Sequence, residues 1–163
     1  AVVPIKGSKS KSGITVKGIH DLAVRFSKCC SPVPGDEIVG FVTRGRGITI
    51  HRTDCINVLN LPEIERSRLI DAEWQGVEED NSAATYSTEI SIFANNRIGM
   101  FVDISKIFTE REIDIKTMNS RVNKQGKATI TMSFDIHGIE ELNNLMAKLR
   151  QIDGVLDIER TTG

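Results

Sequence analysis

Apolar and polar residues alternate most regularly in the second half of the chain. Residues 86–92 and 128–136 place apolar or β-branched side chains at every second position, with polar side chains between them. A period of two puts one face of a strand into the core and leaves the other in water, so both stretches are predicted to be half-buried strands. Residues 113–122 lead through an Asn-Lys-Gln-Gly turn into the second of them, and residues 155–160 are predicted to form a closing strand.

Between these strands the spacing of apolar residues changes to three and four. Phe101, Ile104 and Phe108 recur at helical spacing, and Asn96 is placed to cap that helix. A second helix is predicted over residues 139–150, because its apolar residues form one stripe, its first turn is acidic and its last turn is basic. The order strand-helix-strand-strand-helix-strand predicts the ferredoxin-like βαββαβ fold, with both helices on one face of an antiparallel sheet.

The first half of the chain carries shorter elements. Residues 14–28 are predicted to form one short strand, a turn near Gly18 and a second extended piece that ends at a pair of cysteines. Residues 38–43 and 48–51 are both strand-like, and the Arg-Gly-Arg-Gly sequence between them supplies the glycines that a tight hairpin turn requires. The sequence therefore predicts a β-hairpin with two arginines at its exposed tip.

A short helix is expected after the hairpin. It is predicted over residues 55–59, ends before Pro62 and could be capped by Thr53 or Asp54. Residues 69–74 are then predicted to form one more strand. Together these elements predict a small α+β domain built around the hairpin.

Polar stretches divide the chain into two predicted domains. Residues 1–13 are rich in Lys, Ser and Gly and are expected to be a linker or disordered, and residues 76–83 are polar enough to be a second linker. The small α+β domain is therefore predicted over residues 14–75 and the βαββαβ domain over residues 84–163. Because the chain begins with Ala and this loose stretch, we expect it to be a piece of a longer protein.

The composition is that of an ordinary globular protein, since 39% of the 163 residues are apolar and 26% are charged. The longest apolar runs have about five residues, whereas a helix that crosses a bilayer needs roughly 18. Residues 1–13 also lack the apolar core of a signal peptide. We therefore expect a cytoplasmic protein without a membrane segment.

The net charge of −1 conceals an uneven distribution. Residues 1–55 carry nine Lys and Arg against four Asp and Glu, a net charge of +5, while the other 108 residues carry 12 against 18, a net charge of −6. The two halves are therefore expected to face different partners.

All three cysteines lie in the basic half, and His51 lies close before the last of them. An odd number of cysteines argues against a closed disulfide framework and for reduced thiols. The cluster indicates either a bound ligand or small apolar side chains packed in a core. A Cys near a His could also act as a nucleophile with its base, but no third orienting group is evident, which disfavours a thiol enzyme.

Two stretches of the chain resemble known families. Residues 95–101, between the first strand and the first helix of the predicted βαββαβ unit, are similar to the matching loop of the ACT domain, a small regulatory fold that often binds amino acids. Residues 28–47 and 51–55 resemble the C-terminal regulatory region of the RelA/SpoT homologue (Rel) family, the bifunctional synthetases and hydrolases of the stringent-response alarmone (p)ppGpp. The resemblance covers roughly residues 14–163.

The resemblance implies a role in control rather than in catalysis. In that family the hydrolase and synthetase domains lie N-terminal to this region, and nothing in this chain resembles them. We therefore expect a non-catalytic regulatory region of a GTP pyrophosphokinase and (p)ppGpp hydrolase, acting on those catalytic domains within the protein or through a homodimer of ACT domains. The alternative is an amino-acid-binding ACT dimerisation module of a metabolic regulator.

For the first half, the resemblance implies a conserved-cysteine or zinc-finger domain with Cys29, Cys30, His51 and Cys55 as ligands of zinc. The spacing of His51 and Cys55 suits a ligand pair of structural zinc, whose members are usually about three to five residues apart. Cys29 and Cys30 fit less well, because adjacent side chains of an extended strand point to opposite faces. Both can reach one metal only if the following Ser-Pro sequence bends the chain; reduced cysteines packed in or near the core are the alternative.

Docking on the ribosome, its RNA and the tRNA complex is a further implication of the resemblance. The cations that could contact phosphates from this half are Lys28, Arg44, Arg46 and Arg52. A solvated loop that binds nothing is the alternative.

The ACT resemblance implies an effector site at the start of the first helix of the second half. Its loop residues are Asn96, Arg97, Ile98, Gly99, Met100 and Phe101, and the residues that would complete it across a dimer are Ile115, Met118 and Asn119. Gly99 would let a carboxylate approach the backbone N–H groups at the helix start. The alternatives are that Gly99 only lets the helix and strand pack together, and that this half is a plain dimerisation module.

Overall fold

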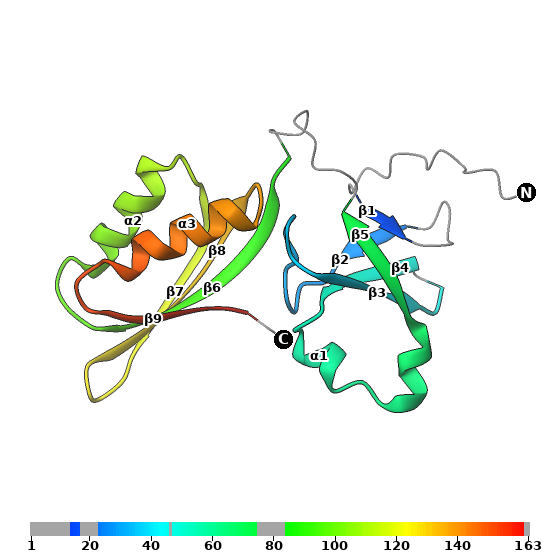
Figure 1. Cartoon of the computed structure of the whole chain (residues 1–163). Helices are drawn as coiled ribbons and strands as arrows, with labels where there is room; N and C mark the ends of the chain where they lie inside the picture. The colour runs from blue at the N-terminus through cyan, green and yellow to red at the C-terminus, as the bar shows by residue number, and fades with distance from the viewer. Residues whose placement is uncertain (1–13, 17–22, 46, 75–83, 162–163) are drawn as a thin grey trace, which may run out of the picture. The chain divides into compact units, whose positions relative to one another are not determined.

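A computed structural model of the chain describes residues 14–16, 23–45, 47–74 and 84–161. The chain divides into two compact units, residues 1–82 with 162–163 and residues 83–161 (Figure 1), and each is considered by itself. The linkers expected at residues 1–13 and 76–83 and the turn expected near Gly18 lie outside the described residues. Among the described residues, no helix is both long and apolar enough to cross a membrane.

The first unit is built on a five-stranded sheet of order β1-β5-β3-β4-β2. Strands β3 and β4 pair in antiparallel fashion along their whole length, which confirms the predicted hairpin. Strand β2 runs parallel to β4, and β5 runs antiparallel to β3 and β1. The strands are β1 (Ile14–Val16), β2 (Val24–Phe26), β3 (Ile38–Thr43), β4 (Gly47–Arg52) and β5 (Leu69–Trp74), and the helices are α1 (Ile56–Leu59) and the 3₁₀ helix η1 (Glu63–Arg68).

The sheet of the first unit is strongly curved. Phe26 on β2 and Trp74 on β5 stack with ring centroids 5.6 Å apart, although β3 and β4 lie between their strands. A flat sheet would keep such strands roughly 14 Å apart, so the sheet must curl to bring the rings together. Ile48 and Ile50 are fully buried on this concave face. A second cluster, which includes the cysteines, forms separately around α1.

The second unit has the predicted βαββαβ order and an antiparallel sheet of order β7-β8-β6-β9. Both helices lie on the same side of the sheet in Figure 1, as the ferredoxin-like fold requires. The elements are β6 (Tyr86–Asn95), α2 (Met100–Glu110), β7 (Ile115–Val122), β8 (Lys127–Ile136), α3 (Ile139–Arg150) and β9 (Val155–Arg160).

The alternating residues of β6 and β8 form the core of this unit. Ile90 and Ile92 on β6 face Met132 and Ile130 on β8, and all four are fully buried. The helices cover them with apolar stripes, and Phe108 on α2 meets Phe134 on β8 edge to face at 5.0 Å. The remaining residues of these two helices that are fully buried are Met100, Ile104, Leu142, Leu145 and Leu149.

The expected helix caps are wrong. Gly99, with a φ of 84°, occupies the N-cap position of helix α2, so Asn96 is not its cap. Helix α1 starts after Cys55 without a side-chain cap, because the hydroxyl of Thr53 donates to Glu37 and the carboxylate of Asp54 binds an arginine. The 3₁₀ helix was also not predicted.

Candidate metal centre

Four candidate ligands meet at one point of the first unit. The ligand atoms of Cys29, Cys30, His51 and Cys55 all lie within 4.8 Å of one another. The Sγ atom of Cys29 is 3.4 Å from Sγ of Cys55 and 3.5 Å from Nδ1 of His51. The Sγ atom of Cys30 is 3.9 Å from the same Nδ1 atom. The four side chains therefore form one compact cluster, drawn from three separate segments of the chain.

A turn lets the adjacent cysteines face the same point. Strand β2 ends at Phe26, and the backbone N–H of Ser31 donates to the carbonyl of Ser27 at 3.0 Å, so the chain coils between these two residues. Ser31 itself has a φ of 47°. Cys29 and Cys30 are thus not part of an extended strand, and the obstacle that strand geometry would present to joint ligation is absent.

The other two ligands come from the end of the hairpin and the start of α1. His51 lies on β4, and the alternation of side chains along this strand places it on the face opposite to the one that carries the buried Ile50 and Arg52. Cys55 occupies the N-cap position of α1 and is fully buried. His51 and Cys55 therefore lie in different elements, a strand and the start of a helix. They approach each other because the chain reverses at Thr53 and Asp54.

Burial and hydrogen bonds give the cluster its electrostatics. Burial raises the pKa of the Cys30 thiol to about 12 and lowers the pKa of His51, so both are neutral in the metal-free protein near pH 7. Burial also opposes ionisation of Cys29, but hydrogen bonds from Ser27, Asn57 and the other thiols together outweigh it and lower the pKa of its thiol. Cys29 therefore ionises more readily than Cys30.

The donor set and its spacing fit a tetrahedral metal ion. Zinc holds thiolate sulfur at about 2.3 Å and imidazole nitrogen at about 2.0–2.1 Å, which places tetrahedral ligand atoms about 3.5–3.8 Å apart. The sulfur–sulfur separation of 3.4 Å and the two sulfur–nitrogen separations of 3.5 and 3.9 Å are close to this range. The three cysteines are free thiols. A set of three sulfurs and one imidazole closes a four-coordinate site and is typical of structural rather than catalytic zinc.

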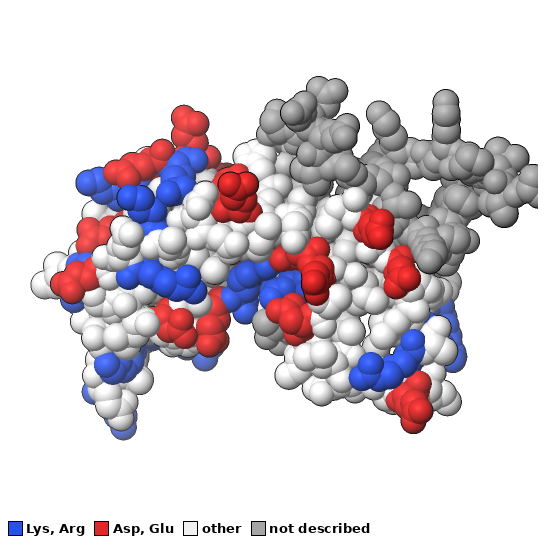
Figure 2. Space-filling view, in the orientation of Figure 1, with Lys and Arg blue, Asp and Glu red and all other residues white. Residues whose placement is uncertain are grey.

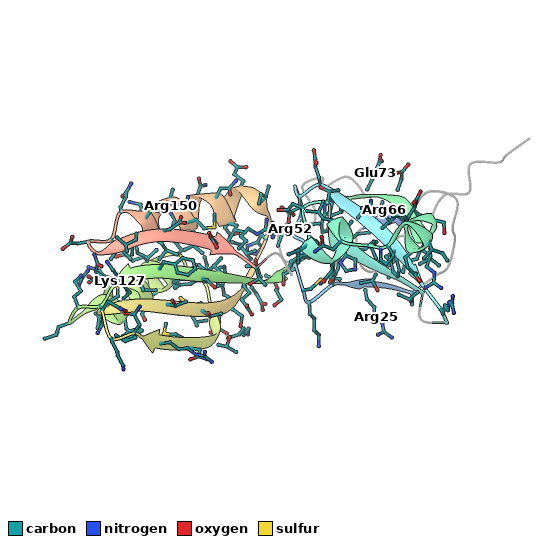
Figure 3. The ribbon with its side chains drawn as sticks, turned by 90° about the horizontal axis from the view of Figure 1, so that it is seen from below. Arg25, Arg52, Arg66, Glu73, Lys127 and Arg150 are labelled. Carbon is teal, nitrogen blue, oxygen red and sulfur yellow. The ribbon has the colours of Figure 1, made fainter. Side chains whose placement is uncertain are left out.

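The four candidate RNA-binding cations lie in different environments. Lys28 and Arg44 are exposed, and Arg46 lies outside the described residues. Arg52 (labelled in Figure 3) is buried, and its guanidinium donates to both carboxylate oxygens of Asp54, at 2.9 and 2.5 Å. Arg52 is therefore held inside the protein rather than presented to a phosphate. On the face seen in Figure 2, Lys and Arg are interspersed with Asp and Glu.

The burial of Arg52 could have been found from the sequence. Ile48, Ile50 and Arg52 alternate along one strand, so Arg52 falls on the face that the two isoleucines bury. The hydrogen bonds of Ser27 and Asn57 to Cys29 could not have been found from the sequence pattern, because they depend on how the cysteine turn and α1 meet.

The predicted effector loop is closed by one of its own side chains. The guanidinium of Arg97 donates to the carbonyl of Asp153 at 2.8 Å and to the carboxylate of Asp103 at 2.6 Å. Ile98 is 100% exposed, whereas Met100 is buried in the core. The other loop residues are the exposed Asn96, the N-cap Gly99 and the exposed Phe101.

The strand residues expected to complete the effector site lie elsewhere in the unit. Ile115, Met118 and Asn119 are on β7, and β8 separates that strand from β6, which leads into the loop. One chain therefore does not bring the two sets together. Phe101, predicted to lie on the apolar stripe of α2, instead lines a shallow groove on the outside of that helix together with Val102, Ser105, Lys106, Thr109 and Glu110.

Both units match known domain families. The family model described as the RelA/SpoT RIS domain matches residues 14–75, and the model described as the ACT domain matches residues 82–160. The second unit is also similar to the crystal structure of the ACT domain from the GTP pyrophosphokinase of Chlorobium tepidum, at 26% identity and a TM-score of 0.43. That similarity covers 47% of this chain and 99% of the other.

Longer relatives align with almost the whole chain. A GTP pyrophosphokinase of Escherichia coli is 36% identical over 98% of this chain and 21% of its own length. The corresponding proteins of Haemophilus influenzae and Streptomyces coelicolor are 34% and 31% identical over 95% and 92% of this chain, and 20% and 17% of their own lengths. The chain thus spans about a fifth of these relatives. It belongs to the RelA/SpoT family and carries a RIS domain followed by an ACT domain.

Proposed function

We propose that this chain is a regulatory, non-catalytic region of a stringent-response (p)ppGpp synthetase and hydrolase. Its first domain would bind one structural zinc ion and dock on ribosomal RNA beside tRNA, and its second would bind an effector or a second copy. Signals from both would reach the catalytic domains of the whole protein. The convergence of the four candidate ligands within 4.8 Å carries this proposal.

Zinc would be held by Cys29, Cys30, His51 and Cys55. When bound, the ion would stabilise the thiolate forms and join the cysteine turn, β4 and α1 into one rigid assembly. The cluster supports this role because its buried residues, Cys30, Cys55 and Val58, form a small core of their own around α1. A metal ion can add to the stability that the limited apolar core of such a small domain provides.

Metal analysis of the purified chain tests the zinc site. We expect one zinc ion per chain, and cobalt substitution should produce the visible absorption of a tetrahedral thiolate site. His51→Gln should weaken binding strongly, while His137→Gln, at an exposed histidine of the second domain, should leave it unchanged. A protein that takes up no zinc or cobalt under reducing conditions would overturn the metal site.

RNA docking is proposed for Lys28, Arg44 and Arg46. Lys28 is exposed and directly precedes the first ligand, and Arg44 is exposed at the hairpin tip. All three belong to the half of the chain that carries a net charge of +5. Each lost phosphate contact lowers the slope of log K against log salt by about one. Arg44→Ala and Arg46→Ala should therefore weaken ribosome binding and flatten its salt dependence, and Lys124→Ala, in the other domain, should not. Unchanged binding at every salt concentration would refute docking through this hairpin.

The second domain is proposed to bind an amino acid or to dimerise. Supporting this, the β6–α2 loop presents Ile98 to solvent at the start of an 11-residue helix, where N–H groups favour a carboxylate. Equilibrium dialysis with branched-chain amino acids and sedimentation of the same samples separate the two roles. Amino-acid binding with no change of mass favours the effector site, and a dimer that binds no amino acid favours the dimerisation module. A monomer that binds no amino acid would contradict both roles.

The absence of catalysis is tested directly. The pure chain should not form (p)ppGpp from GTP and ATP or degrade it, because the two matched domains are RIS and ACT. Turnover by the pure chain would show that this assignment is wrong.

A further inference from the structure

We infer that Arg52 and Asp54 form a positioning clamp that holds the cysteine turn against the end of β4 and the start of α1 before metal binds. This inference rests on the proposed metal site, and it assigns to Arg52 a role inside the protein in place of an RNA contact. Neither residue is a ligand, so the clamp would act through Cys30 and Cys55.

The clamp is visible in the hydrogen bonds of Arg52. The Nη1 atom donates to the carbonyl of Cys30 at 3.2 Å, while Nε and Nη2 hold the carboxylate of Asp54. The backbone N–H of Arg52 also donates to Sγ of Cys30 at 3.3 Å. One residue of the hairpin therefore binds both the backbone and the sulfur of a ligand 22 positions earlier in the chain.

The other end of the clamp reaches the ligand after the hairpin. Asp54 directly precedes Cys55, so fixing its carboxylate against Arg52 sets the course of the chain from β4 into α1. The guanidinium thus ties the backbone at Cys30 to the residue next to Cys55. His51 is adjacent to Arg52 and is carried by the same segment.

The environment of Arg52 favours a specific role over an incidental one. Its side chain is 7% exposed, whereas that of Asp54 is 59% exposed. Withdrawing a cation from water is costly unless it is paired and hydrogen-bonded, which is the case here. A guanidinium presents donors in a planar fork that can hold a carboxylate with two bonds and a carbonyl with another, whereas a lysine ammonium is a point charge.

The clamp would lower the cost of assembling the metal site. Groups that orient metal ligands typically contribute about 10- to 100-fold to metal affinity. If Arg52 were only a surface cation, its replacement would leave metal affinity unchanged. If it only stabilised the fold, metal affinity would recover under conditions in which the variant is fully folded.

Metal titration of the full chain tests the clamp. Zinc affinity is measured by competition with a chromophoric chelator for Arg52→Met, Arg52→Lys and Asp54→Asn, at a temperature where circular dichroism shows each variant to be folded. We expect about 10- to 100-fold weaker binding for Arg52→Met and incomplete rescue by Arg52→Lys. Arg25→Met, at an exposed arginine of β2 that points away from the sheet in Figure 3, is the matched control.

A second readout needs no metal. Cys30 is 1% exposed, so its alkylation in the chelator-treated protein, located by peptide mass spectrometry, should be slow and should become several-fold faster in Arg52→Met. If the parent protein binds no metal, the zinc proposal fails and the clamp is judged by this alkylation rate alone. If Arg52→Met changes neither zinc affinity nor the alkylation of Cys30, the clamp does not exist.

Discussion

His51 is the candidate ligand whose ordinary pKa lies nearest to neutrality. Burial lowers its pKa below 6.5 in the folded protein, so folding favours the neutral imidazole. The stability contributed by this group is therefore complete above about pH 6.5 and is lost as the pH falls through the lowered pKa of the folded state. Metal binding requires the same neutral form, so acid weakens both the metal-free fold and the metal site.

This reasoning predicts the pH dependence of the metal-free protein. In the presence of a chelator, the free energy of unfolding of the first domain should fall as the pH decreases from about 7 to 5. His51→Gln should flatten that dependence, whereas His137→Gln should retain it. Urea unfolding at a series of pH values measures the slopes, and an equal slope in the parent and His51→Gln would contradict the assignment.

The β3–β4 hairpin requires glycine more strictly at position 47 than at position 45. Gly45 and Gly47 have φ values of 72° and 81°, but a Cβ atom at Gly47 would lie 2.2 Å from the carbonyl oxygen of Ala23, while nothing lies within 4 Å of one at Gly45. That carbonyl accepts the N–H of Ile48 at 2.9 Å and joins β2 to the hairpin. A side chain at Gly47 would therefore push away the strand that leads to the cysteine turn.

We expect the two alanine substitutions to differ in size. Gly45→Ala should cost about 1–2 kcal/mol through its left-handed backbone alone, whereas Gly47→Ala should cost about 2–5 kcal/mol because the steric clash is added. Only Gly47→Ala should also weaken metal binding. Chemical denaturation and metal titration check both statements, and equal effects of the two substitutions would argue against this contact between β2 and the hairpin.

Helix α2 has a buried and an exposed phenylalanine that can be compared directly. Phe108 is 1% exposed and packs on Phe134, whereas Phe101 is 39% exposed beside the outer groove. Phe108→Ala should destabilise the second domain by about 3–5 kcal/mol, and Phe101→Ala by about 1 kcal/mol or less. Thermal unfolding of both variants provides the measurement. A large loss for Phe101→Ala would mean that this side chain is covered in solution, for example by a second copy.

The whole chain is expected to unfold as two cooperative units. These units are the domains predicted at residues 14–75 and 84–163. Calorimetry should resolve two unfolding transitions. Zinc should stabilise only the first domain, by about 2.7 kcal/mol at a free zinc concentration 100 times the dissociation constant, and should raise only the midpoint of its transition. Phe108→Ala should lower only the midpoint of the second domain's transition. A single transition that responds to both changes would contradict independent domains.

Alternation and helical spacing were sufficient to predict the second domain. Its helix at residues 139–150 and its strand at residues 155–160 have the predicted bounds, because strand and helix periods are local properties that a single sequence displays. The hairpin and the strand at residues 69–74 followed from the same kind of pattern.

The cluster depended on tertiary structure. The sequence by itself identified the residue types and the basic half, but the approach of Cys29 and Cys30 to His51 and Cys55 follows from sheet pairing and from a turn whose geometry no local period encodes. The fold also set the partners of the buried Arg52 guanidinium, the carbonyl of Cys30 and the carboxylate of Asp54, although alternation along β4 already indicated its burial. Distances between residues far apart in the sequence are set by how elements pack, so the chain determined the candidates and only the fold brought them together.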